Sequence, residues 1–566
     1  MSSRWRILPR LPTEHPLNAN DYPPLLKQAL YNRGIADTDD AELFFSADHR
    51  LSHDPWLMPD IEKAVQRIQQ GLLRGEKIAV YGDFDVDGIC ATALMAQGLR
   101  MLGADVVSYI PHRLQEGHGL NSHALAELHA RGVSLVITAD CGISGTAQSR
   151  GMHSSRLPPL DMVITDHHLP PTDGLPPAVA IVDPKRTDSR YPLSELAGVG
   201  VAFKLLQALL GGLGREDEAG QFLDLVALGT VADLMPLTGE NRFLVTAGLE
   251  HLRNSHRPGI RELAAQAGLK LEKLDAQDIS FALAPRLNAA GRLEHAISAY
   301  NLLMTNDDTE AMELAAKLCE QNIQRQRLTS DAMKQAGEQL TLHGVTPVLM
   351  VKHPDFAGGI LGLIAGRLCD EYYHPAIAMQ TGGETVIGSC RSIPEFNITA
   401  AISQCAGLLT RFGGHAQAAG FSMPAANLGQ FEKHLNEIAA KQLEGLDLRP
   451  QIEIDTETRL GELGAGIHAL IQKLAPFGAG NAAPVFLSRE VFIADYRTMG
   501  ATGNHLRFKF RQGAALWDAV AFGMGERDVN VQVPLDIVYN LEMDEWNGEN
   551  RLRLNLLDFA NTGTNI

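Results

Sequence analysis

The possible folds of this chain are limited most by a regular alternation of short apolar runs and helical patterns between residues 61 and 182. β-Branched and aliphatic side chains fill five short runs, at residues 77–81, 105–110, 133–138, 161–165 and 179–182. Helical patterns occupy residues 61–73, 89–102 and 122–131. Strands that alternate with helices form parallel sheets covered on both faces. The sequence therefore predicts an α/β fold with a parallel sheet here.

The rest of the chain divides by composition. A length of 566 residues indicates about four domains. Residues 306–340 read as one long polar helix without Gly or Pro before Gly337, a pattern typical of a helix that bridges two domains. The last hundred or so residues are rich in strands, which favours a small barrel. We expect an N-terminal segment (1–50), an α/β domain (51–305), a bridging helix (306–344), a second α/β domain (345–445) and an OB-like β-barrel (450–566).

Charge and cysteine content restrict the class of protein. The formal net charge is −18, so any contact with nucleic acid requires a local basic patch on an acidic body. The six cysteines form no Cys-x-x-Cys pair, which argues against a zinc ribbon and against a disulfide scaffold. The N-terminus lacks the apolar core of a signal peptide, and no apolar run is long enough to span a membrane. We expect a cytoplasmic protein.

Three carboxylates follow the first apolar run of the predicted sheet. Asp83, Asp85 and Asp87 alternate with other residues, and Gly88 follows them. In an extended segment, alternate residues share one face, so the three charges repel unless a cation lies between them. An acidic solvated turn or a calcium-type loop is the alternative, but a calcium-binding EF-hand has a helix before its loop, whereas a strand precedes this one. Alone, this motif leaves both interpretations open.

Acidic and imidazole groups follow two further runs and one helix. Asp140 ends the run 133–138, the triplet Asp166-His167-His168 ends the run 161–165, and Asp233 ends an apolar helical pattern. Each residue alone is more often a cap or turn residue. Together they bring carboxylate oxygen and imidazole nitrogen to one sheet edge, a mixture that suits Mn²⁺ or Mg²⁺ better than zinc. There are enough ligands for two ions about 4 Å apart, as in two-metal phosphoryl hydrolases.

This ordered set of four motifs resembles the DHH phosphoesterase superfamily. The resemblance implies metal binding by one set of side chains: Asp83, Asp85, Asp87, Asp140, His167 and Asp233. It also implies that Asp140 bridges two ions, that His168 faces the scissile phosphate, and that Asp166 orients a neighbouring imidazole. Two positions depart from the family pattern. Tyr81 stands where many members have His, which would weaken the first ion site, and Cys141 stands where Asn is common.

Two downstream segments narrow the resemblance to members that degrade single-stranded DNA. Residues 284–293 are similar to a Pro-Arg-x-Asn-Ala-Ala-Gly-Arg motif, and Gly413-Gly-His415 matches the motif of the DHH-associated domain. The resemblance implies a 5′-to-3′ exonuclease that releases 5′-mononucleotides in DNA recombination and repair. It further implies single-strand-binding protein and a RecQ-type helicase as partners. A monomer would be adequate.

Candidate DNA contacts are basic, amide, hydroxyl or glycine residues in the downstream part of the chain: Arg286, Asn288, Arg292, Arg367, Ser389, Arg391, Ser392, Gly413, Gly414 and His415. Residues 388–392 read as a turn rich in phosphate donors. The alternatives are ion pairs for the arginines, such as with Glu294, and a purely structural Gly-Gly turn.

The last domain offers one further candidate surface. Arg507, Lys509 and Arg511 alternate with Phe508 and Phe510, which gives a basic face on a strand. That face is either an OB-fold surface for single-stranded DNA or a solvated face over an aromatic core.

Two rival functions remain at this stage. A DHH enzyme for small phosphates is one, but such chains usually lack the final barrel and the segment 284–293. A non-catalytic DNA-binding scaffold is the other, but degenerate members lose acidic ligands that this chain retains.

Overall fold

The computed structural model describes residues 3–113, 115–144, 160–500, 503–546 and 549–563. The chain forms two compact units. The core unit comprises Asp48–Gly445 with Gly478–Gly480, and the barrel unit comprises Met1–Ala47, Leu446–Phe477 and Asn481–Ile566.

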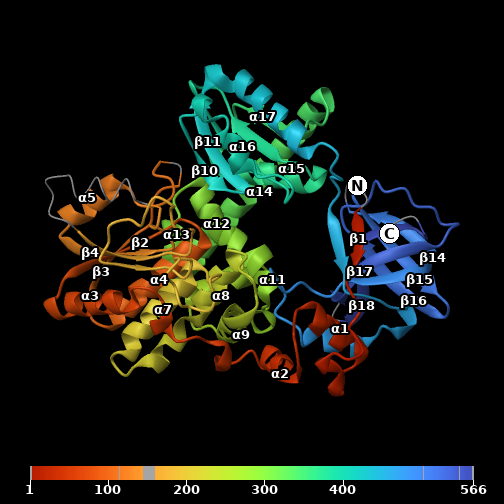
Figure 1. The fold of residues 1–566 in the computed structure, drawn as a ribbon, viewed down its shortest axis with the longest axis horizontal. Coiled ribbons are helices and arrows are strands. Elements are labelled where there is room, and N and C mark those ends of the chain that lie inside the picture. Colours follow the sequence, from red (N-terminus) through yellow and green to blue (C-terminus); the bar gives the residue numbers. More distant parts are fainter. Residues whose placement is uncertain (1–2, 114, 145–159, 501–502, 547–548, 564–566) are drawn as a thin grey trace. The chain divides into compact units, whose positions relative to one another are not determined.

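The first sheet of the core unit is entirely parallel, with strand order β3-β2-β4-β5-β6. Its strands are β2 (Lys77–Gly82), β3 (Asp105–Tyr109), β4 (Val133–Ala139), β5 (Asp161–Thr165) and β6 (Ala180–Val182). Figure 1 shows α5 (Ser122–Ala130) on one side of these strands and α3 (Ile61–Arg74) and α7 (Gly198–Gly211) on the other. The predicted α/β fold is therefore confirmed.

Side chains of alternate residues of β2 pack on opposite faces of this sheet. Ile78 and Val80 belong to the large core that includes α4 (Val86–Met101) and α7. Ala79 and Tyr81 belong to the smaller core under α5. Because both faces are buried, the strand sequence is almost continuously apolar, and the carboxyl ends of the strands are the free edge for polar groups.

Helices follow the sheet and lead to one long helix. They are α8 (Leu223–Ala232), α9 (Gly239–Arg253), α10 (Pro258–Gln266), α11 (Ala276–Asp278), α12 (Ala284–Leu293) and α13 (Ile297–Met304). Helix α14 runs over Asp308–His343, and the side chain of its N-cap residue Asp307 accepts a hydrogen bond from the Glu310 amide. Ala311, Ala315 and Leu318 on its first half join the large core.

The second sheet of the core unit is mixed, with order β10-β11-β9-β8-β7. Its strands are β7 (Leu349–His353), β8 (Ala376–Gln380), β9 (Thr385–Arg391), β10 (Arg411–His415) and β11 (Ala418–Pro424). Helices α15 (Leu361–Tyr372), α16 (Ile398–Ser403) and α17 (Leu428–Leu443) accompany it.

Two segments of this sheet correct the sequence interpretation. The stretch from Gly388 to Arg391 was predicted to be a turn, but it is the end of β9, paired with both β8 and β11. Gly388 is required there by close packing, because a Cβ atom would lie 2.3 Å from Cζ of Phe421. Gly413 and Gly414 likewise lie within strand β10 and not in a turn.

The barrel unit contains the predicted small barrel. Its sheet has the order β13-β14-β15-β16-β18-β17, and a further pairing of β14 with β17 closes it. The strands are β13 (Thr456–Glu457), β14 (Phe486–Met499), β15 (His505–Gln512), β16 (Ala515–Ala521), β17 (Leu535–Trp546) and β18 (Glu549–Asn561). Phe508 and Phe510 of β15 fill its interior.

The N-terminal segment belongs to the barrel unit. Strand β1 (Arg4–Ile7) pairs in parallel with β12 (Gln451–Ile454). Helices α1 (Pro24–Asn32) and α2 (Thr38–Ser46) pack with Leu474, next to α18 (Ala465–Gln472). A pairing across more than 440 residues has no local sequence signal.

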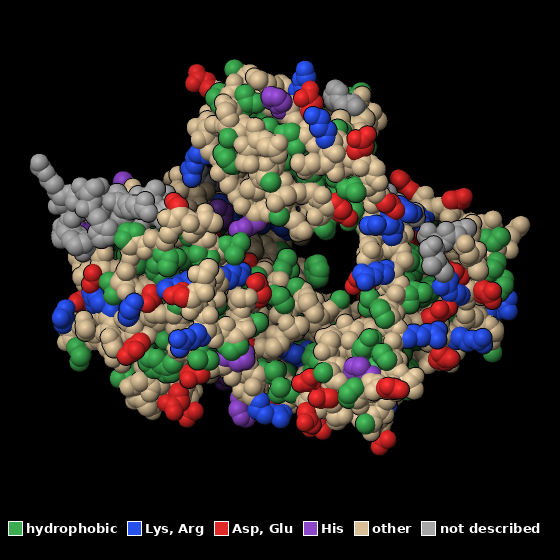
Figure 2. Space-filling model, in the orientation of Figure 1, with side chains coloured by type: hydrophobic (Ala, Val, Ile, Leu, Met, Phe, Trp, Pro, Cys, Tyr) green, Lys and Arg blue, Asp and Glu red, His purple; other side chains and the backbone are tan. Residues whose placement is uncertain are grey.

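The surface reflects the acidic composition. On the face shown in Figure 2, Lys and Arg side chains are interspersed with Asp and Glu side chains and form no continuous basic coat. None of the described helices is long and apolar enough to cross a membrane.

Candidate metal centre and anion site

The predicted metal ligands follow strands that are neighbours in the first sheet. Strands β2, β4 and β5 lie side by side, and their carboxyl ends meet at one edge. Asp140 follows β4, and His167 follows β5 by two residues. Asp233 comes from elsewhere, because it is the C-cap residue of α8.

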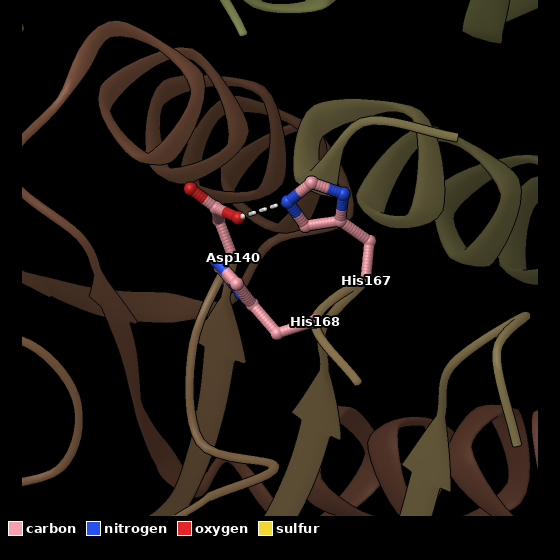
Figure 3. A group of neighbouring side chains, drawn as sticks. All are labelled: Asp140, His167 and His168. Carbon is pink, nitrogen blue, oxygen red and sulfur yellow. Dashed lines mark ion pairs between the residues drawn. The ribbon is translucent and has the colours of Figure 1, made fainter. Parts of the chain in front are cut away.

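The structure brings these side chains together in three overlapping groups, each with ligand atoms within 4.8 Å of one another. The groups are Asp87 with His167 and Asp233, Asp83 with Asp85 and Asp140, and Asp140 with His167 and His168. Nε2 of His167 lies 3.2 Å from Oδ1 of Asp140 and 3.5 Å from Oδ2 of Asp233. Figure 3 shows the His167 imidazole directed at the Asp140 carboxylate.

The three carboxylates after β2 do not share one extended face as the sequence predicted. The strand ends at Gly82, and Asp85 is the N-cap residue of α4, where its side chain accepts a hydrogen bond from the Gly88 amide. Asp87 therefore lies in the first turn of a helix and joins a different group from Asp83 and Asp85. The change from strand to helix therefore separates Asp87 from Asp83 and Asp85. A centre for two ions needs its ligands divided between two positions in this way.

Burial and mutual repulsion dominate the electrostatics of this centre. Burial, followed by repulsion from neighbouring carboxylates, raises the pKa of Asp87 and of Asp140 well above the usual value. The same causes raise the pKa of Asp233 to about 7. Burial and the charge of His168 lower the pKa of His167 to about 3, so its imidazole is neutral and has a free lone pair.

Several polar atoms in this centre have no partner. Oδ1 of Asp140, Oδ2 of Asp233 and Oδ1 of Asp83 are buried without a hydrogen bond. Unpaired buried acceptors are costly, and a bound cation would satisfy them. Carboxylate oxygens with one neutral imidazole nitrogen match the ligand preferences of Mn²⁺ and Mg²⁺.

Backbone groups of α7 hold one candidate ligand in place. The amides of Gly198 and Val199 donate to Asp87 at 2.6 Å and 2.9 Å. A Cβ atom on Gly198 would lie 2.4 Å from Oδ1 of Asp140, so only glycine fits here. The sequence analysis missed this role, although the Ala-Gly-Val-Gly pattern at residues 197–200 is the signal for such a close approach.

His168 is oriented by Asp166, as the family resemblance implied. Nδ1 of His168 lies 2.7 Å from Oδ1 of Asp166, and the other carboxylate oxygen accepts from the Ile143 amide. Burial alone would lower the pKa of His168, but the hydrogen bond and charge of Asp166 outweigh it and raise that pKa to about 9. A protonated imidazole is a donor suited to a phosphate oxygen.

Four arginines of the core unit form a second feature, which we call the arginine group: Arg113 after β3, Arg292 in α12, Arg325 in α14 and Arg391 in β9. Burial, and then repulsion from the other three, lowers the pKa of Arg292 to about 9. Among the described residues none of the four forms an ion pair with a carboxylate at contact distance, although Asp85 and Asp83 exert an attraction on Arg113. Uncompensated guanidinium groups beside a metal centre suit a phosphate.

The sequence analysis identified only part of the arginine group. Arg292 and Arg391 were predicted to contact DNA, whereas Arg113 and Arg325 were missed. The Cζ atom of Arg113 lies 4.8 Å from the centre of the Phe84 ring, next to the acidic motif. Arg113 follows β3, the edge neighbour of β2, and this position at the same sheet edge is the signal that was available.

Contacts between α12 and the second domain bring the candidate DNA contacts of the second domain near the arginine group. A Cβ atom on Gly359 would lie 1.9 Å from the Arg292 carbonyl oxygen, and Nη1 of Arg292 donates to the Gly359 carbonyl. Gly362 similarly lies against Ser389 and Arg391. Gly359 therefore allows α12 and the second domain to approach closely, whereas Gly362 allows α15 to pack against β9 within the second domain.

The remaining predicted DNA contacts occupy varied positions. Ser392 donates its hydroxyl to the Phe396 carbonyl, Arg367 is exposed, and Asn288 is half-buried in α12. Gly413, Gly414 and His415 are exposed on β10. The His415 ring is parallel to that of His168 with centroids 6.4 Å apart, so the Gly-Gly-His motif adjoins the metal centre.

The two departures from the family pattern have structural partners. Tyr81 donates its hydroxyl to the Gly119 carbonyl and stacks on Tyr109 under α5. Cys141 is buried, and its thiol contacts the Tyr81 carbonyl at 3.6 Å. One further residue was missed by the sequence analysis: His118, whose Nδ1 lies 3.1 Å from Oδ2 of Asp83.

Comparison with known proteins identifies the family. Family models match residues 77–230 (DHH family, N-terminal domain), 345–441 (DHHA1 domain) and 454–558 (RecJ OB domain). The chain is 38% identical to the single-stranded-DNA-specific exonuclease RecJ of Bacillus subtilis, over 95% of this chain and 68% of that protein. It is 33% identical to the RecJ of Dickeya dadantii, over 97% of this chain and 98% of that protein.

A solved structure shows the same fold. The crystal structure of RecJ in complex with Mn²⁺ from Thermus thermophilus superposes with a TM-score of 0.85 at 28% identity, and the match covers 99% of this chain and 80% of that one. Similarity of this extent, in sequence and in structure, establishes common membership. The chain belongs to the RecJ family of DHH phosphoesterases.

Proposed function

We propose that this protein is a metal-dependent exonuclease that degrades single-stranded DNA from the 5′ end and releases 5′-mononucleotides, in recombination and repair. The observation that carries the proposal is that arginines lie beside the acidic metal centre: Arg113 lies over the ring of Phe84 within the acidic motif, and Arg292 contacts the second domain through Gly359. Metal ligands without nearby cations would suit many hydrolases. The arginines favour a substrate with several phosphates.

Two divalent ions, Mn²⁺ or Mg²⁺, fit the donor set. Asp87, His167 and Asp233 would hold one ion, Asp83 and Asp85 the other, and Asp140 belongs to both sides. Ions bound there supply an activated water and neutralise charge on the phosphate.

The chain's own groups position the substrate. His168, held by Asp166, donates a proton or a hydrogen bond to an oxygen of the scissile phosphate. Asp166 keeps the Nδ1 proton of His168 in place, so that Nε2 faces the substrate.

The arginine group and Ser389 would hold the terminal 5′ phosphate. A terminal phosphate has more negative charge than an internal diester, so several converging guanidinium groups prefer a chain end. That preference would favour action from an end, and the first linkage beyond the terminal phosphate would then lie at the residues that would hold the metal ions. His415, Gly413 and Gly414 would contact the strand on the other side of His168.

The protein binds single-stranded DNA with its catalytic domains and its OB domain. Single-strand-binding protein and a RecQ-type helicase are the proposed partners that deliver this substrate. We propose that the protein acts as a monomer in the cytoplasm. Co-purification from cells with crosslinked DNA would test these partners.

A labelled strand tests the reaction itself. With Mn²⁺ present, a single strand labelled at its 5′ end should release labelled mononucleotide at the earliest time points. The same strand labelled at its 3′ end should release label only at the end of digestion, and a blunt duplex should resist. Early release of the 3′ label, or fragments cut internally, would refute the proposal.

A further inference from the structure

Phe281 is exposed where a core residue would be expected. Its side chain is 81% exposed, whereas Ile279 and Leu283 on either side of it are fully or almost fully buried. Burying a phenylalanine side chain stabilises a fold, and this position gives up that stabilisation. A lone exposed apolar residue needs no explanation in itself, and Leu73 in α3, 88% exposed, is one such residue. The surroundings of Phe281 make it different.

The backbone at Phe281 is irregular. Ile279–Leu283 form a π-helix between α11 and α12. Such wide turns are rare and occur frequently at functional sites. This turn leads directly into α12, which supplies Arg286 and Arg292.

One arginine contacts this turn, and a second lies near that arginine. Nη1 of Arg286 donates to the carbonyl of Ala282, the residue after Phe281, at 2.8 Å. Nε of Arg286 and Nε of Arg325 are buried without a hydrogen-bond partner. Burial, and then repulsion from Arg367 and Arg286, lowers the pKa of Arg325, which also acts on Arg292 of the arginine group. Arg286 therefore contacts the turn that carries Phe281, and Arg325 is close enough to both Arg286 and Arg292 for their charges to repel.

We propose that Phe281 is a stacking platform for one base of the bound strand, with Arg286 and Arg325 contacting the phosphates beside that base. An aromatic ring among cations is the arrangement by which proteins bind single-stranded nucleic acid without sequence preference. Bases in a duplex are not available for such stacking, so Phe281 adds to the selectivity for single strands. This inference rests on the proposed function and specifies a binding residue remote from the chemistry.

Binding without cleavage tests the platform. Fluorescence anisotropy with chelator present would measure the affinity of wild type, Phe281→Ala, Phe281→Trp and the control Leu73→Ala for 5′-phosphorylated strands of increasing length. We expect Phe281→Ala to weaken binding of long strands about tenfold or more, and to leave the affinity for dinucleotides, which are too short to reach Phe281, at the wild-type value. Phe281→Trp should retain wild-type affinity, and Leu73→Ala should have no effect.

An abasic nucleotide moved stepwise along the strand separates stacking from other roles. Wild type should lose affinity when the abasic position meets Phe281, and Phe281→Ala should not respond there. Equal loss of affinity by Phe281→Ala for intact and abasic strands would overturn the inference. So would a lowered melting temperature without any length-dependent loss, because Phe281 would then be packing against protein. Failure of the wild type to degrade single strands would instead refute the proposed function.

Discussion

The buried carboxylates around His167 are close together at a cost in free energy. Asp87, Asp140 and Asp233 repel one another in a desolvated site, and one carboxylate oxygen each of Asp140 and Asp233 has no hydrogen-bond donor. Such groups are retained when function requires them. The identities of these residues were predictable from the sequence because each follows a strand or helix end. The division of these residues between two candidate ion positions was not predictable, because it depends on the residue at which β2 ends and α4 begins.

Asp140→Asn should separate stability from activity. Without metal, removing one repelling charge should raise the melting temperature, and Asn tolerates the left-handed backbone (φ 65°) that Asp140 adopts. Mn²⁺ should then no longer stabilise the variant, and hydrolysis should fall at least about 100-fold. Scanning calorimetry with and without Mn²⁺ and a nuclease assay measure both effects. Asp355→Asn, at a side chain 87% exposed, is the control. Near-normal nuclease activity of Asp140→Asn would exclude the assigned role.

Whole elements were predicted where their signal is local. The strands of the first sheet and the long helix were found within a few residues, because apolar strands and helical periodicity are properties of the segments themselves. Strand β16 was not predicted, residues 388–392 were predicted to form a turn, and a turn was the alternative interpretation of Gly413 and Gly414. Their strand conformation comes from pairing with neighbours distant in sequence, which glycine propensity opposes.

The packing of α7 on α9 depends on a buried ion pair. Nζ of Lys204 lies 2.8 Å from Oε1 of Glu240 and donates to the His53 carbonyl, with both side chains fully buried. Lys204→Met should lower the free energy of unfolding by about 3–5 kcal/mol, because it leaves a buried carboxylate unpaired. Adding Glu240→Gln should recover part of the loss. Lys317→Met, which breaks the exposed pair with Glu294, should cost less than about 1 kcal/mol. Denaturant unfolding measures these values, and equal losses at the two sites would contradict the assignment.

At the scale of the whole molecule, the chemistry is assigned to the core unit alone, whereas strand binding is assigned to both units. The candidate centre lies entirely within the core unit. A fragment of residues 48–445 should therefore fold and retain Mn²⁺-dependent hydrolysis of short strands, with weaker binding of long ones. Circular dichroism and steady-state kinetics on strands of two lengths would test this. A folded fragment without activity on short strands would show that the barrel unit contributes to the chemistry.

The barrel unit is expected to bind DNA through the basic face of β15. Lys509 and Arg511 are exposed there, over the buried Phe508 and Phe510, and Arg507 approaches Asp518 at 3.7 Å. Replacing Lys509 and Arg511 by Gln should reduce the salt dependence of binding by about 0.7 per lost phosphate contact. Lys433→Gln on α17, which is exposed in the core unit, is the matched control. An unchanged salt dependence would mean that this face is only solvated.

The central claim is that two metal ions bind among the strand-end carboxylates and His167. Anomalous diffraction at the manganese edge, from a crystal grown with Mn²⁺ and a short 5′-phosphorylated strand, tests it most directly. The account predicts two peaks about 4 Å apart, one by Asp87, His167 and Asp233 and the other by Asp83 and Asp85, with Asp140 contacting both. A crystal without a peak at these residues, or with manganese bound only elsewhere, would contradict it.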